Sequence, residues 1–80
     1  MPRRLKLSPL QRDIVMMLEE AGAETVGTVI ATLKPPDQGE FAAQVDGLVT
    51  LGLIRKDENN LVLTEQGRIA LRTWAITQLT

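Results

Sequence analysis

The chain has 80 residues, of which 44% are hydrophobic and 24% are charged, and its formal net charge is −1. This composition is typical of a single soluble globular domain, and no apolar run approaches the roughly 20 residues that a membrane-spanning helix needs. The chain holds no cysteine and no histidine, which excludes disulfides, thiolate metal sites and the usual general base near neutral pH. We therefore expect a cytoplasmic protein that is not an enzyme and that binds no metal or cofactor.

Charge is distributed unevenly along the chain. Residues 1–12 carry four basic residues and no acidic one, whereas residues 13–50 carry seven acidic residues against one lysine. The remainder is nearly balanced. We expect residues 1–7 to form a basic N-terminal arm and residues 8–80 to form a single domain.

A first helix is predicted to begin after Ser8. Serine is a favoured N-cap, Pro9 suits the first helical position, and Gln11 stands where a capping box needs it. Gly22 predicts the end of this helix. The apolar stripe between them, at helical spacing, comprises Leu10, Ile14, Met17, Leu18 and Ala21.

A second helix is predicted between Thr25, which can cap it, and the pair Pro35 and Pro36, which end it. Gly27 weakens this helix by about 1 kcal/mol relative to alanine, unless a close packing contact requires it. Its expected apolar face comprises Val26, Val29, Ile30 and Leu33.

A third helix is predicted from Asp37 to a stop at Gly52, with Glu40 placed to complete a second capping box. Its residues recur at helical spacing, which indicates one buried stripe. That stripe comprises Phe41, Val45, Leu48 and Val49.

A β-hairpin and a last helix follow. The first strand begins at residues 53–54, the turn-forming residues Asp-Glu-Asn-Asn at 57–60 make a four-residue loop, and residues 61–63 return. Thr64 caps a helix that runs to about Leu79. The inner face of that helix, with a glycine that allows close approach, comprises Gly67, Ala70, Leu71, Trp74 and Gln78.

The order of these elements is helix, helix, helix, hairpin, helix. Its second half reads L-x-x-L-G-L-I followed by L-x-L-T-x-x-G-x-x-x-L, carried by Leu48, Leu51, Gly52, Leu53, Ile54, Leu61, Leu63, Thr64, Gly67 and Leu71. This pattern resembles the winged helix-turn-helix domains of MarR- and PadR-type transcriptional regulators. The resemblance implies a mainly α fold with a small β-hairpin: a three-helix bundle, a hairpin wing and a C-terminal helix.

The resemblance also implies binding to double-stranded DNA, with the third helix in the major groove. Against this, the third helix carries no lysine or arginine, and Asp37, Glu40 and Asp46 repel phosphates. The candidate DNA-binding residues are Arg3, Arg4 and Lys6 in the arm, Gln38, Gln44 and Thr50 on the third helix, and Arg55 and Lys56 at the wing.

The acidic third helix leaves an alternative function open. The domain is then a protein-interaction module that does not bind DNA, and its small, smooth surface of Ala42, Ala43 and Gly47 packs against a partner, unless it packs against the first helix of its own chain. A homodimer through the last helix is a further expectation, because the resemblance to these winged-helix regulators, which commonly pair through terminal helices, implies it. The candidate dimer residues are Ile69, Thr73, Ile76 and Leu79.

Overall fold

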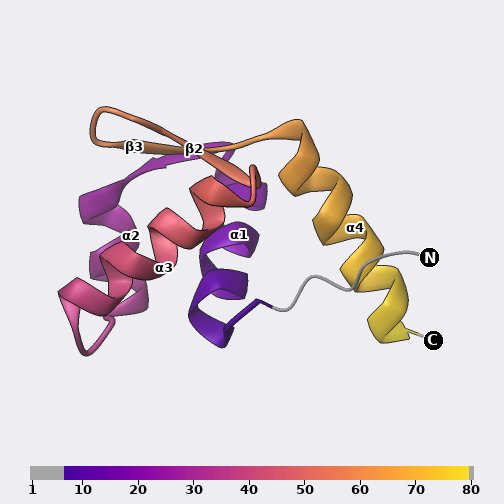
Figure 1. Cartoon of the computed structure of the whole chain (residues 1–80), viewed down its shortest axis with the longest axis horizontal. Helices are drawn as coiled ribbons and strands as arrows, with labels where there is room; N and C mark the ends of the chain where they lie inside the picture. Colours follow the sequence, from indigo (N-terminus) through magenta and orange to yellow (C-terminus); the bar gives the residue numbers. More distant parts are fainter. Residues whose placement is uncertain (1–6, 80) are drawn as a thin grey trace.

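The computed structural model describes the backbone of residues 7–79 and the side chains of residues 7–72. This part of the chain is mainly helical, with four helices and one small antiparallel sheet of three strands (Figure 1). In chain order the elements are α1 (Pro9–Ala21), β1 (Ala23–Thr25), α2 (Val26–Leu33), α3 (Gln38–Thr50), β2 (Ile54–Asp57), β3 (Asn60–Leu63) and α4 (Glu65–Leu79).

The predicted capping box of α1 is confirmed. The Ser8 hydroxyl accepts a hydrogen bond from the Gln11 N–H at 3.1 Å, and the Gln11 side-chain oxygen accepts one from the Ser8 N–H at 3.0 Å. Gly22 ends the helix with a φ of 82°, a left-handed conformation that glycine adopts without the strain of a Cβ atom.

Helices α2 and α3 are joined by a short, proline-containing connection, as expected. Thr25 caps α2 by accepting the Thr28 N–H at 3.1 Å, and the left-handed Lys34 ends it, one residue before the prolines. Asp37 caps α3 and accepts the N–H groups of Gly39 and Glu40 at 2.8 and 3.2 Å. The two helices therefore begin at polar side chains that satisfy otherwise unpaired backbone donors.

The sheet differs from the expected two-stranded hairpin in having a third strand. Strand β1 pairs with β3, so that the strand order is β1-β3-β2. No sequence pattern predicted β1, because three residues that end at a helix cap are too few to show a period. The predicted four-residue loop is also wrong: Asp57 pairs with Asn60, which leaves a turn of only Glu58 and Asn59. Pairing between β2 and β3 therefore extends to the turn itself.

The core is aliphatic apart from one phenylalanine, and no polar residue is buried within the described part. Two predictions about it are wrong. Val49 is 38% exposed, since it is rotated about 80° around α3 from Phe41 at 100° per residue, and Ala21, the last residue of α1, is exposed. Val15, not expected in the stripe, is buried. The buried residues are Ile14, Val15, Leu18, Val29, Phe41, Val45, Leu48, Leu53, Ile54, Leu61 and Leu63.

Helix α4 is attached to the hairpin through Thr64 and Gly67. The Thr64 hydroxyl donates to the carbonyl oxygens of Gly52 and Leu53, at 2.6 and 2.9 Å, and accepts the Gly67 N–H at 3.0 Å. A Cβ at position 67 would collide with the Leu53 carbonyl oxygen and lie 2.7 Å from a methyl group of Leu63. The predicted close approach of this glycine is thus confirmed.

Candidate nucleic-acid interface

The outward side of α3 is the first candidate surface. Its exposed residues include Gln38 and Thr50, which were expected to contact DNA, and Ala42 and Ala43, which were expected to contact a partner. Exposed acidic residues lie among them at positions 40 and 46. This side of the helix is therefore uncovered by the described chain but offers no positive charge.

Two other expected members of this surface are engaged within the protein. The Gln44 side-chain oxygen accepts the Ser8 hydroxyl at 2.8 Å, and the Gln44 carbonyl oxygen accepts the Gln11 amide at 3.2 Å. A Cβ at Gly47 would lie 2.9 Å from the same Gln11 amide nitrogen. Gln44 and Gly47 are both partly buried, so they join α3 to the start of α1. At Gly47 the absence of a side chain therefore allows α3 to pack against α1, and this residue does not belong to the surface expected to contact a partner.

Apolar side chains are exposed at the end of α3 and on α4. Val49 is 38%, Leu51 is 44% and Ile69 is 56% exposed. A Cβ at Gly52 would lie 3.1 Å from the Gln66 side-chain oxygen, which brings the end of α3 against the first turn of α4. Ile69 is one of the residues expected at a dimer interface. Its exposed side chain is compatible with that expectation, which stays a prediction. The side chains of Thr73, Ile76 and Leu79 lie outside the described residues.

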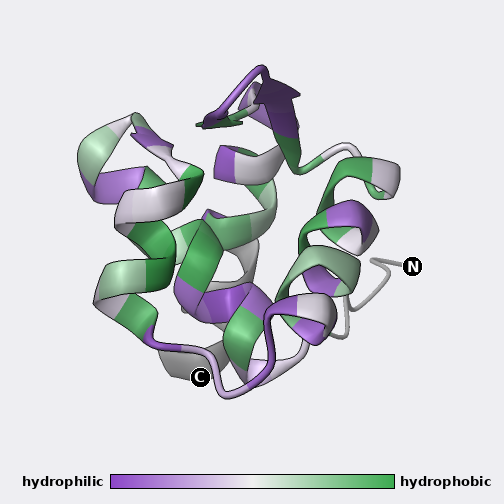
Figure 2. Ribbon diagram, turned by 90° about the vertical axis from the view of Figure 1, so that its left-hand side faces the viewer, coloured by the Kyte–Doolittle hydropathy of each residue, from purple (hydrophilic) through white to green (hydrophobic). Residues whose placement is uncertain are grey.

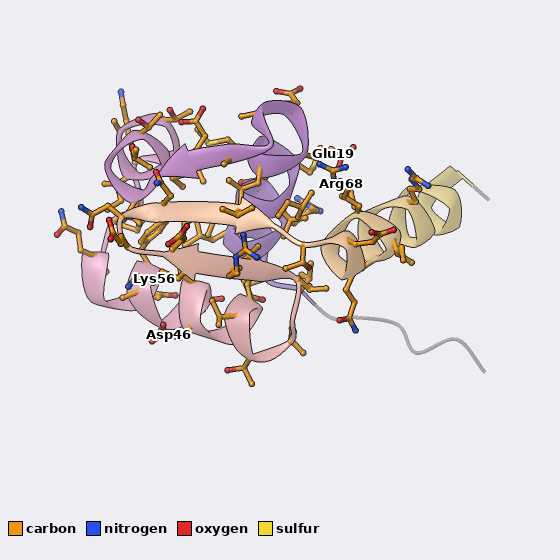
Figure 3. All side chains as sticks on the ribbon, turned by 90° about the horizontal axis from the view of Figure 1, so that it is seen from above. Glu19, Asp46, Lys56 and Arg68 are labelled. Atoms are coloured by element: carbon orange, nitrogen blue, oxygen red, sulfur yellow. The ribbon has the colours of Figure 1, made fainter. Side chains whose placement is uncertain are left out.

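The two basic residues of the hairpin point to opposite faces of the sheet. Arg55 is paired with Val62 and Lys56 with Leu61, and successive side chains along a strand alternate between faces. Lys56 therefore shares the face of the buried Leu61, which is turned toward α3, and Figure 3 shows it at the same flank of the molecule as Asp46. Of these two basic residues, only Lys56 lies where it can contact the same ligand as α3.

The hairpin does not project as a free wing. Thr25 of β1 pairs with Asn60 beside the turn, and the Asn59 carbonyl oxygen accepts the Val26 N–H at 2.8 Å. Figure 2 shows the hairpin tip in the hydrophilic colour, in contrast to the apolar stripes of the helices below it. The tip is thus polar, short and tied to the start of α2.

A hollow of about 310 Å³ opens between the start of α1 and the α2–α3 connection. No sequence pattern predicted this hollow, because it forms where segments distant in the chain meet. Among the described residues no group of three or more carboxylates, histidines or cysteines could hold a metal ion. The residues that line the hollow are Ser8, Pro9, Leu10, Asp13, Leu33, Pro35, Pro36, Asp37, Glu40 and Gln44.

The arm residues Arg3, Arg4 and Lys6 lie outside the described residues. None of the helices in the described part is both long and apolar enough to cross a bilayer. Comparison of the chain with protein-family models, with curated proteins and with solved structures finds no match.

Proposed function

We propose that the chain is a winged helix-turn-helix domain of the MarR and PadR kind, and that it binds double-stranded DNA as a small transcriptional regulator. The observation that carries the proposal is the arrangement around α3. This helix follows α2 across the short Lys34–Asp37 connection, has one side that no described residue covers along its 13 residues, and is followed by the β2–β3 hairpin. A helix of that length extends about 20 Å, which suits the major groove.

Charge sets the affinity that this arrangement can reach. Phosphate contacts from lysine and arginine supply most of the sequence-independent affinity for DNA. Lys56 is the basic residue of the hairpin that lies on the sheet face turned toward α3. On α3 itself, Gln38 and Thr50 offer neutral hydrogen-bonding groups. We therefore expect weak binding that depends on few phosphates.

The salt dependence of binding tests this proposal. If about three phosphates are neutralised, raising the salt from 50 to 200 mM weakens binding by roughly 40-fold. Fluorescence anisotropy of a labelled duplex measures this directly. Lys56→Ala is expected to weaken binding and to reduce the salt slope by about 1, whereas Arg55→Ala, on the opposite sheet face, is the matched control. The absence of binding at 50 mM salt, or an affinity that salt does not change, contradicts the proposal.

A second candidate function is supported by the charge of α3. Glu40 and Asp46 flank the exposed Ala42 and Ala43, and an acidic, smooth surface suits a basic or apolar protein partner better than it suits phosphates. The domain then acts as a protein-interaction module.

The substitution Ala43→Arg separates the two candidates because it acts in opposite directions on them. An added positive charge on the groove-facing side of α3 strengthens DNA binding, whereas a bulky charged side chain disrupts a packed protein interface. Anisotropy with DNA and sedimentation of the protein report the two effects. If DNA affinity does not rise, α3 does not face the duplex.

A further inference from the structure

We propose that the basic segment at residues 1–6 docks in the hollow between the start of α1 and the α2–α3 connection of its own chain. The docking itself does not depend on DNA binding. It is argued below from the lining of the hollow, its charge and the reach of the segment.

The lining of the hollow is chemically mixed. Half of its residues are leucines and prolines, namely Pro9, Leu10, Leu33, Pro35 and Pro36. Three carboxylate side chains, those of Asp13, Asp37 and Glu40, stand among them, and no lysine or arginine does. Asp37 also caps α3 through one carboxylate oxygen, and all three carboxylate residues are exposed. An occupant that fits carries apolar groups together with positive charge.

The segment at residues 1–6 has this chemistry. Its sequence, Met-Pro-Arg-Arg-Leu-Lys, places three positive charges beside methionine, proline and leucine. Arginine and lysine pack their aliphatic stems on apolar surface while their charged heads meet carboxylates. Three positive charges thus meet three negative ones, and apolar side chains meet apolar lining.

The segment is also long enough to reach. It joins the domain next to Ser8, which itself lines the hollow. Asp13 lies five residues further along α1, a rise of about 7.5 Å, and Glu40 lies one turn before Gln44, whose side chain bonds to Ser8. Four extended residues span up to roughly 14 Å, so Arg3, Arg4 and Lys6 can reach these carboxylates once the chain turns back.

The strength of the contacts favours the segment of the same chain over that of a second copy. Exposed ion pairs are individually weak, so three of them give a bimolecular complex with a Kd of roughly millimolar or weaker. A short tether supplies an effective concentration in the millimolar range or above. Docking within one chain is therefore populated at concentrations where docking between copies is not.

Docking affects the proposed function in two ways. It engages Arg3, Arg4 and Lys6, so these candidate DNA-binding residues do not contact phosphates while the segment is docked. Asp37 and Glu40 lie at the start of α3 and Asp13 lines the same hollow from α1, and pairing them with the segment cancels negative charge at that end of α3. Repulsion between α3 and a phosphate backbone is then reduced.

Paramagnetic relaxation measured by NMR tests the docking. The chain has no native cysteine, so Pro2→Cys carries a single nitroxide label on the full chain. We expect loss of amide signal at Leu33 and Glu40, which are distant from the label in sequence. Neutralising the hollow with Asp13→Asn and Glu40→Gln removes two exposed pairs and lowers the docking equilibrium roughly two- to thirty-fold, which reduces the signal loss at those amides.

The matched control neutralises two exposed acids of α1 away from the hollow, Glu19→Gln and Glu20→Gln, and is expected to leave the signal loss unchanged. Equal signal loss in the hollow variant and the control overturns the proposal. Signal loss on isotope-labelled protein that carries no nitroxide, mixed with unlabelled nitroxide-bearing protein, overturns docking within one chain in favour of exchange between copies. Because no DNA is present, a failure here is separate from a failure of the proposed function.

Discussion

Gly67→Ala is the substitution whose effect the structure defines most sharply. The new Cβ would collide with the Leu53 carbonyl oxygen and approach the Leu53 carbonyl carbon to 3.1 Å and a methyl of Leu63 to 2.7 Å. The Leu63 methyl can rotate away. The Leu53 carbonyl is backbone and cannot yield cheaply, because the N–H and the hydroxyl of Thr64 both bond to it at 3.1 and 2.9 Å.

The magnitude follows from two opposing effects. Overpacking of this kind costs about 1–3 kcal/mol, and each hydrogen bond lost when the Leu53 carbonyl shifts costs about 1 kcal/mol more. Alanine in a helix regains at most about 1 kcal/mol relative to glycine. We expect a net loss of about 1–3 kcal/mol in the free energy of unfolding, which lowers the Tm of a domain of this size by about 5–20 °C.

Gly27→Ala is the matched control, because it makes the same chemical change in another helix. Gly27 is exposed, and nothing lies within 4 Å of the position of a Cβ there. No close packing contact in the described part of the chain therefore requires a glycine at this position. We expect a gain of about 0.5–1 kcal/mol. Thermal and urea unfolding followed by circular dichroism measure both variants. A Gly67→Ala protein as stable as the parent, or one that shifts in the same direction as Gly27→Ala, would refute the packing at this junction.

Two further predictions concern the hairpin and its junction with α4. Thr64→Val is expected to destabilise the fold by about 1–3 kcal/mol, since a helix cap is lost and two carbonyl oxygens lose a donor; Thr25→Val, at an exposed cap, is the control and should cost only about 1 kcal/mol. A similar loss in both variants would argue against the Thr64 contacts. Glu58→Gly is expected to stabilise the hairpin by about 0.5–1 kcal/mol, because Glu58 has a φ of 55° and glycine adopts that conformation without strain. Urea unfolding measures this, and a loss of stability would contradict it.

The approximate helix boundaries and most of the core residues could be predicted from the sequence alone. Local chemistry explains this success: Ser8, Thr25 and Asp37 cap the helices by bonding to N–H groups two or three residues away, and such contacts are readable from residue types at short spacing. The burial of Leu61 and Leu63 followed from the two-residue period of a strand, and the close approach at Gly67 from a glycine within a helical pattern.

Which surface residues are accessible could be read only from the three-dimensional structure. Whether Gln44 is available to a ligand depends on Ser8, 36 residues away, and whether Gly47 is a free surface depends on Gln11. Strand β1 exists because β3 pairs with it, and the same pairing holds the hairpin tip against the start of α2. These contacts are long-range, so no local period or spacing encodes them. The number and sign of the charges can be read directly from the sequence. The packing of the helices sets where these charges lie: along the exposed side of α3, with Lys56 at one flank, and around the hollow at the start of α1.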